Sequence, residues 1–202
     1  MASVTRQQYL DAGQDLLADG GVQAVTIASL CERLGVTKGS FYHHFRNVED
    51  FHDQLLDDWF TEHVARRKAV TDVLSDPRAR LEGLRRLAVD RRHDTEAAIR
   101  AWARTSARAA EVQRRIDNNR RAYVVDVCIA LGIDRTRAET FADLSVVMLA
   151  GSQNLGGPVD QAMVDRLARE LADQVLAAVP AGRRPSRARS AAPSRAATEP
   201  TR

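Results

Sequence analysis

One short stretch of the chain brings together hydrogen-bonding side chains, a cation and a glycine. Residues 37–43 read Thr-Lys-Gly-Ser-Phe-Tyr-His. On a helix, at about 100° per residue, Gly39 and His43 point to one side. Ser40 and Tyr42 flank that side. Such groups can bond to base edges and phosphates, whereas the sequence offers no nucleophile–base–acid set, phosphate loop or metal-ligand spacing. The stretch therefore predicts recognition of nucleic acid rather than catalysis.

Two residues of this stretch are unfavourable in an isolated helix. Glycine destabilises a helix interior by about 1 kcal/mol relative to alanine, so Gly39 makes sense if the helix must approach another backbone closely. Lys38 would stand at the helix start, where a cation is disfavoured by the helix dipole. A nearby phosphate would reverse that penalty, because helix N-termini favour phosphates.

A first short helix is predicted just before this stretch. Thr26 is a candidate N-cap, because its hydroxyl can accept a hydrogen bond from a backbone N–H of the first turn. Apolar residues then recur at the spacing of one helix face, namely Ile27, Leu30, Cys31 and Leu34. Gly35 follows them, at a position where a helix end favours a residue that tolerates a left-handed backbone.

The second helix is predicted from Lys38 to Phe45, with Thr37 as its N-cap. Phe41 and Phe45 fall on the same side of it and are expected to pack against the first helix. Two short helices joined by a tight turn over residues 26–45 form a helix-turn-helix pattern, and the second helix of that motif enters the major groove of DNA.

This stretch resembles the DNA-binding domain of the tetracycline-repressor (TetR) family of transcriptional regulators. The matching residues are Thr26, Ile27, Ala28, Leu34, Gly35, Val36, Thr37, Gly39, Phe41, Tyr42, His44, Phe45, Asn47, Glu49 and Asp50. In that family the exposed face of the second helix binds bases and its tyrosine contacts phosphate. The resemblance therefore implies that DNA is contacted by Thr26, Thr37, Lys38, Gly39, Ser40, Tyr42 and His43. Val48 departs from the family pattern, which usually has a lysine there.

Metal binding and redox chemistry are competing interpretations of the histidines and cysteines. His43 and His44 would point about 100° apart on a helix, so joint ligation of a metal is not expected. We assign His43 to DNA and His44 to packing within the small domain. Cys31 and Cys128 lie far apart and show no metal or redox spacing. The sequence thus predicts neither a metal nor a cofactor.

Length and hydropathy restrict the class of protein. The 202 residues suffice for one or two domains with a real core. No apolar run approaches the roughly 18 residues of a transmembrane helix, and the N-terminus shows no basic-then-apolar leader. We therefore expect a cytoplasmic protein that does not bind a membrane.

Charge is distributed unevenly around a net value of +3. Residues 1–60 hold four cations and nine acids, whereas residues 180–202 hold six arginines and one acid. The DNA-binding part is therefore acidic overall, and its positive footprint must be local, around Arg33, Lys38 and Arg46. This predicts modest non-specific affinity and a shallow salt dependence.

Apolar periodicity predicts an all-α fold of about nine helices, without strands. A three-helix helix-turn-helix unit begins with a capping box at Thr5 and leads into a long fourth helix that starts near Asn47. Further helices are expected at about 78–93, 95–107, 109–131, 136–155 and after Asp160. We divide the chain into a DNA-binding domain, a ligand-binding and dimerisation domain, and a disordered basic tail, at residues 3–63, 64–179 and 180–202.

Two further sets of residues are weaker candidates. A small-molecule cavity between helices could be lined by Trp59, Trp102, Tyr123, Phe141 and Met148, although each of them alone is more often a core residue. The resemblance implies that the last two helices pair with those of a second subunit, and candidate interface residues are Leu144, Val147, Leu167, Leu171 and Val175. Gln153 and Asn154 face either the cavity or the dimer contact.

Adjacent arginines occur at residues 66–67, 85–86, 91–92, 114–115 and 120–121. We interpret these pairs as solvated helix faces. Asp117 is expected to form an ion pair with Arg120 or Arg121 at helical spacing.

Together these observations predict a homodimeric repressor that binds a palindromic DNA operator and is released by an unknown small-molecule effector. The effector rests on the resemblance alone, and an activator is not excluded. Two other classes remain open. One is an architectural protein that binds DNA without sequence preference, and the other is an enzyme with an attached helix-turn-helix domain.

Overall fold

The computed structural model describes residues 4–89, 92–155 and 158–180, apart from the side chains of residues 71 and 72. Within these ranges the chain is helical between its turns and contains no strand, so the predicted all-α fold is confirmed. The elements are α1 (Arg6–Gly20), the 3-10 turn η1 (Val22–Ala24), α2 (Ile27–Leu34), α3 (Lys38–His44), α4 (Val48–Val73), α5 (Pro77–Val89), α6 (His93–Trp102), α7 (Ala107–Ala130), α8 (Arg135–Ser152) and α9 (Gln161–Ala177).

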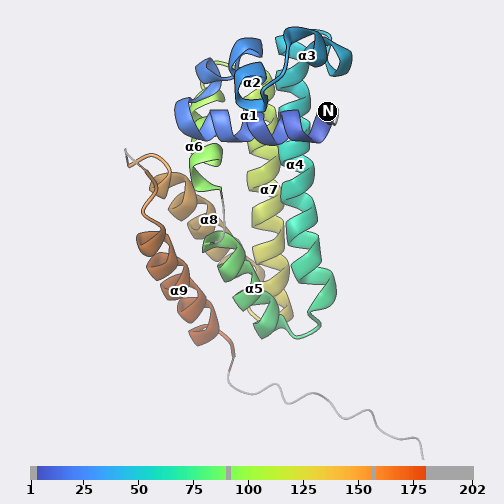
Figure 1. Ribbon diagram of the computed structural model, residues 1–202. Coiled ribbons are helices and arrows are strands. Elements are labelled where there is room, and N and C mark those ends of the chain that lie inside the picture. The colour runs from blue at the N-terminus through green and yellow to red at the C-terminus, as the bar shows by residue number, and fades with distance from the viewer. Residues whose placement is uncertain (1–3, 90–91, 156–157, 181–202) are drawn as a thin grey trace, which may run out of the picture.

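The helices form a small domain at one end of a longer bundle. Figure 1 shows α1, α2 and α3 gathered at that end, while α4 and α7 run side by side away from it. At the opposite end α5 and α8 pack on α7, and α9 packs on α5 and α8. Helix α6 lies between the two parts, since it contacts both α1 and α7.

Side-chain caps fix where most of these helices begin. The Thr5 hydroxyl accepts from the Gln8 N–H at 3.2 Å while the Gln8 side chain accepts from the Thr5 N–H at 2.8 Å, as the capping box predicts. Asn47 caps α4 by accepting from the Asp50 N–H at 2.7 Å. Gly35 ends α2 with φ 66° and ψ 36°, the left-handed conformation expected of it.

The buried apolar side chains form two clusters, and both include residues of α7. The first holds Tyr9 and Phe41 of the small domain, and it continues into Phe51 of α4, Ile99 of α6 and Ile116 of α7. A three-helix unit buries too little surface to be robust alone, and its core is completed here by α4, α6 and α7. The second cluster lies at the far end of the bundle, between α5, α7, α8 and α9.

Several boundaries differ from the expectation, by as much as five residues. Helix α6 ends at Trp102 rather than near residue 107, because Ser106 caps α7 by accepting from the Ala109 N–H at 3.2 Å. Helix α5 ends at Val89. Beyond Pro180, the predicted tail lies outside the described residues. In the described part of the chain no helix combines the length and apolar character needed to cross a membrane.

The close approach of α1 to α4 depends on Gly13. A Cβ atom there would lie 2.7 Å from Cζ of Phe51 and 3.2 Å from Cδ1 of Leu55. We predict that Gly13→Ala lowers the free energy of unfolding by about 1–3 kcal/mol, because the extra methyl overpacks a tight core. Urea unfolding followed by circular dichroism, at matched protein concentration, measures the change.

Gly39→Ala is the matched control for that experiment. A Cβ atom at Gly39 would meet no atom closer than Thr37 Oγ1, at 3.6 Å. Alanine is also the better helix former, so the control should be at least as stable as the original chain. Equal stability of the two variants would contradict the proposed steric role of Gly13.

Candidate nucleic-acid interface

Aromatic contacts fix how α3 is rotated on the small domain. Phe41 and Phe45 are both buried, and each meets the Tyr9 ring edge-on, at centroid distances of 5.8 and 5.7 Å. Phe45 also packs edge-on against Phe51 of α4, at 4.9 Å. Edge-to-face pairs of this kind are directional as well as apolar, so they hold α3 in one orientation.

The opposite side of α3 is open to solvent. Tyr42 is 56% exposed, and Thr37, Lys38, Gly39 and His43 are exposed with it, while Ser40 is half-buried. The predicted division of α3 into an apolar side and a polar side is confirmed. We use the term recognition face for the surface formed by residues 37–40, 42 and 43.

The fold itself does not require two features of the recognition face. A Cβ atom at Gly39 would make only an ordinary contact with Thr37 Oγ1, at 3.6 Å, and the Thr37 hydroxyl makes no capping bond within α3. Thr26 behaves differently, because it caps α2 by accepting from the Ser29 N–H at 3.1 Å. The glycine and the uncommitted Thr37 hydroxyl are therefore available for contact with another molecule.

The cations expected around α3 are not equally available. Arg33 pairs with Asp19, and Arg46 pairs with Asp50 at 2.9 Å. The Arg46 side chain, by hydrogen bonding, holds the pKa of the Asp50 carboxyl well below its usual range. Among the described residues Lys38 forms no salt bridge, so it remains the available cation at the start of α3.

His44 points inward, as expected. Its Nε2 lies 2.9 Å from the Val4 carbonyl oxygen, and its ring packs on Tyr9 at 5.6 Å. The neighbouring His43 is exposed. Among the described residues, no group of three or more His, Cys, Asp or Glu side chains is arranged to hold a metal ion.

An apolar cavity of ≈ 80 Å³ lies in the far part of the bundle, between α4, α5, α7, α8 and α9. Of the five predicted pocket residues only Met148 lines it. Trp59 lines a separate small cavity, and Trp102 packs on His52 instead, at 5.2 Å. Phe141 belongs to the second core cluster. The Tyr123 ring packs under the guanidinium group of Arg67, a residue of α4. The apolar residues that line the cavity are aliphatic. Looking for aromatic residues in the sequence therefore does not identify them.

Two of the arginines interpreted as solvated are buried, which corrects that interpretation. Arg67 is 3% exposed and Arg120 is 6% exposed, and both line the apolar cavity. The position of each arginine around its helix explains why it is buried. Arg67 follows the buried Trp59 and His63 at intervals of four residues, and Arg120 follows the buried Ile116 in the same way. This periodicity was available in the sequence and distinguishes each of them from its exposed neighbour.

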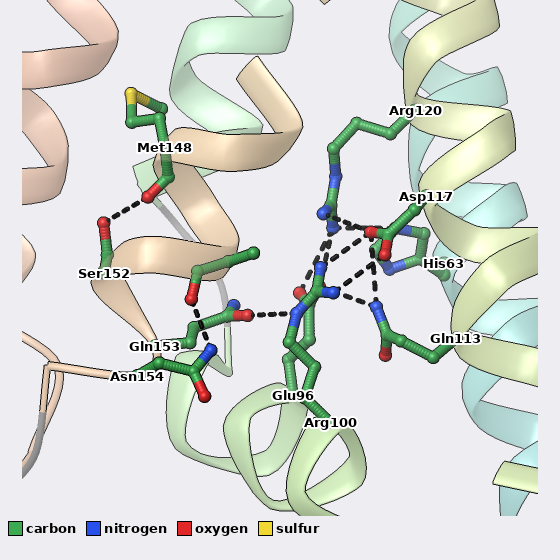
Figure 2. A network of polar contacts seen from close by, with 11 residues as sticks. His63, Glu96, Arg100, Gln113, Asp117, Arg120, Met148, Ser152, Gln153 and Asn154 are labelled. Atoms are coloured by element: carbon green, nitrogen blue, oxygen red, sulfur yellow. Dashed lines mark hydrogen bonds and ion pairs between the residues drawn. The ribbon is translucent and has the colours of Figure 1, made fainter. Parts of the chain in front are cut away.

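Arg120 belongs to a buried network of ion pairs (Figure 2). It donates to Glu96 of α6 at 2.9 Å and to Asp117 at 3.0 Å, which confirms the expected pair at helical spacing. Arg100 of α6 bonds to Asp117 at 2.6 Å and to the Gln153 side chain at 2.7 Å. The network thus links α6, α7 and the end of α8, and it includes Gln153, which we had expected at the cavity or the dimer contact.

An apolar surface remains open on α8 and α9. Val147 is 66% exposed, and Leu144 and Leu167 are also exposed. Leu171 is half-buried and lines the cavity. Val175 is 1% exposed and packs inside its own subunit, so it contributes to the core rather than to an outer surface.

Comparisons with known proteins agree with this architecture. The family model described as bacterial regulatory proteins, tetR family, matches residues 10–54. The transcriptional repressor KstR2 of Mycobacterium tuberculosis is 32% identical over 79 residues, which cover 39% of this chain and 40% of that protein. The sequence match to this relative thus spans about two-fifths of its length.

Solved structures match over most of the chain. A transcriptional regulator from Rhodococcus sp. has a TM-score of 0.69 at 23% identity, covering 86% of this chain and 97% of its own. A regulator from Saccharomonospora viridis in complex with choline has a TM-score of 0.68 at 16% identity, covering 85% and 95%. At these identities the likeness concerns the fold. Residues 10–54 therefore form a helix-turn-helix segment of the tetR family of bacterial regulatory proteins, and the chain shares the fold of these solved regulators.

Proposed function

We propose that the protein is a sequence-specific DNA-binding repressor and that residues 3–63 form its DNA-binding domain. The observation that carries the proposal is the recognition face, an exposed polar surface on a helix whose other side is locked into an aromatic core. Tyr42 and Lys38 would contact phosphates, and His43 would contact base edges. Such a regulator works on the chromosome, so we place it in the cytoplasm.

A second copy of the chain completes the proposed repressor. The exposed Leu144, Val147 and Leu167 form an apolar surface on α8 and α9, and such a surface favours an apolar partner. A symmetric dimer through these two helices would present two recognition faces. Each would enter one of two successive major grooves, about 34–36 Å apart, on a palindromic operator.

A small-molecule effector would control release from DNA. Support comes from the apolar cavity, which lies in the part of the chain, residues 64–179, that we assign to ligand binding and dimerisation. A structural neighbour that holds choline is consistent with this role. An effector can release DNA only if it binds the released conformation more tightly than the bound one.

Tyr42→Phe tests the phosphate contact. The change keeps the exposed ring and removes one hydroxyl, whose bond to a charged phosphate contributes about 1.5–3 kcal/mol. We predict that affinity falls by a similar factor for upstream intergenic DNA and for random DNA. Titration of both DNAs by fluorescence anisotropy measures this. Arg78→Ala, at an exposed residue of α5, is the control. Unchanged affinity in the Tyr42 variant would refute the assignment.

His43→Ala tests base recognition in the same assay. We predict that the binding free energies for upstream intergenic DNA and random DNA become closer by about 1–3 kcal/mol, because one base-edge contact is lost. Random DNA should be bound as before. If the original chain already binds both DNAs equally, the protein is an architectural one instead.

Gly39→Ala separates DNA binding from folding. The new methyl group fits the isolated fold, but it would stand between α3 and a DNA backbone. We predict unchanged or higher thermal stability together with weaker operator binding. Preserved operator affinity would show that α3 does not approach DNA through Gly39.

Val147→Lys tests the dimer surface. Placing a charge on an apolar interface should disfavour association, and monomers should then bind the operator weakly. Analytical ultracentrifugation at several concentrations gives the oligomeric state. Val73→Lys, at an exposed valine at the end of α4, is the matched control. A Val147 variant that stays dimeric would place the interface elsewhere.

A further inference from the structure

The apolar cavity between α4, α5, α7, α8 and α9 offers a ligand few polar contacts. Leucine, valine, alanine and methionine side chains form most of its described walls. Four of the described lining residues carry polar side chains, namely Arg67, Arg85, Arg120 and Ser145. What a ligand can bond to therefore depends on where the polar atoms of these four side chains lie.

The charges of the two most deeply buried arginines are directed away from the cavity. Both terminal nitrogens of Arg67 are inaccessible, and its guanidinium group lies 5.6 Å from the centre of the Tyr123 ring. Arg120 donates to Glu96 at 2.9 Å and to Asp117 at 3.0 Å. Long basic side chains can cover apolar surface with their aliphatic stems while the charged end binds elsewhere. These two arginines therefore line the cavity with their stems.

Arg85 and Ser145 are also bonded to other groups of the protein. Arg85 donates to Glu82 at 2.8 Å and to Asp165 at 2.5 Å. The Ser145 hydroxyl donates to the backbone carbonyl of Ala142 at 2.7 Å, within α8. A ligand that brought a charge or a polar group into the cavity would lose its bonds to water and gain few in exchange, which costs free energy. The cavity therefore favours an uncharged, apolar molecule.

The volume of the cavity limits the size of that molecule. It measures ≈ 80 Å³, whereas an apolar cavity of about 150 Å³ accommodates benzene. A molecule of about three or four non-hydrogen atoms therefore fits the cavity as it stands. Benzene would enter only if the surrounding helices separated. Water is a poor occupant, because a buried water needs about two to four polar partners.

We propose that this cavity binds a small, uncharged, apolar molecule of the size of a short hydrocarbon, held by the aliphatic side chains around it. The driving force is the removal of apolar surface from water. Choline, which a structural neighbour holds, carries a positive charge and is not expected to bind here. The role of the apolar molecule as effector rests on the proposed repressor function, whereas the binding site itself does not.

Arg120 connects the cavity to the DNA-binding domain. Its stem lines the cavity while its guanidinium group holds Glu96 of α6 (Figure 2), and α6 packs on α1. A molecule that overfills the cavity would push on this stem and strain the ion pair with Glu96. Displacement of α6 would then alter the support of α1, whose Tyr9 holds α3. We therefore expect benzene-sized molecules, rather than the smallest ones, to affect DNA binding.

Two methionines make occupancy of the cavity measurable. Met148 and Met163 are both half-buried, but only Met148 lines the cavity. Protein labelled with carbon-13 in its methionine methyl groups would be studied by NMR under xenon and under propane, with Met148→Leu assigning the signal. We expect both gases to shift the Met148 signal to saturation and to leave that of Met163 unchanged. No Met148 shift with either gas, or equal shifts of both signals, would overturn the proposal.

Probes of similar size test the requirement for an apolar molecule. Propane would be compared with ethanol, ethylammonium and acetate in the same NMR titration. Propane should bind about tenfold or more tightly than ethanol, because the ethanol hydroxyl would lose its bonds to water. Ethylammonium, acetate and the larger choline should not shift the Met148 signal. Ethanol or acetate binding as tightly as propane would refute the apolar character of the site.

Ala172→Leu tests the location by filling the cavity. Ala172 lines it, whereas the exposed Ala177 of the same helix does not, so Ala177→Leu is the matched control. Ala172→Leu should abolish propane binding and raise the thermal unfolding midpoint, because filling a cavity commonly stabilises a fold. The control should bind propane as the original chain does.

Propane binding that persists in a folded Ala172→Leu variant, or that is lost in both variants, would refute the location. If Ala172→Leu does not fold, the titrations of the original chain decide the proposal.

Adding the upstream intergenic DNA separates this proposal from the repressor function. Propane binding at Met148 supports the cavity assignment whether or not the protein binds DNA. Absence of a specific DNA complex would refute only the repressor function. A complex that persists at saturating benzene would refute the effector role of an apolar molecule.

Discussion

The ion pair between Glu96 and Arg120 is the interaction on which the two halves of the molecule depend. Glu96 is 1% exposed, and a carboxylate so deeply buried has to be paired. Removing one partner of a buried pair typically costs about 3–5 kcal/mol, because the other charge is left without compensation. Helix α6 therefore stays on α7 as long as Glu96 has its guanidinium partners. Since α6 also packs on α1, this pair contributes, with the continuous helix α4, to the placement of the DNA-binding domain on the bundle.

The two halves are held by different forces, and that difference bears on how a signal would travel. Helix α3 is fixed by edge-to-face contacts of Tyr9 with Phe41 and Phe45. Such contacts are favourable in only one relative orientation of the rings. In the network Asp117 accepts from Arg100, Arg120 and Gln113 together. Polar groups with several partners can exchange them at little cost, whereas a packed aromatic core cannot. We therefore expect a conformational change to arise at the network and to move α3 as a rigid unit.

Sequence alone predicted the parts of the fold that depend on neighbours along the chain. The caps at Thr5 and Asn47 and the two sides of α3 follow from local spacing, and they were correctly predicted. The buried network was not, because Glu96 and Arg120 are 24 residues apart and meet only once α6 has packed on α7. The cavity was missed for a related reason. Its walls combine aliphatic side chains from five helices, and no single helix indicates which of its apolar residues leave a space.

The acidic balance of the DNA-binding domain also has a structural explanation. Asp15 of α1 pairs with Arg92 at 2.8 Å, and Asp57 of α4 pairs with Arg108. These acids therefore connect the small domain to arginines that lie just before α6 and at the start of α7. Their negative charge is partly neutralised within the fold, and it is directed toward the bundle rather than toward α3. With Arg33 and Arg46 paired as well, DNA recognition would depend on hydrogen bonds from the recognition face more than on net charge, which favours selection among sequences over non-specific affinity.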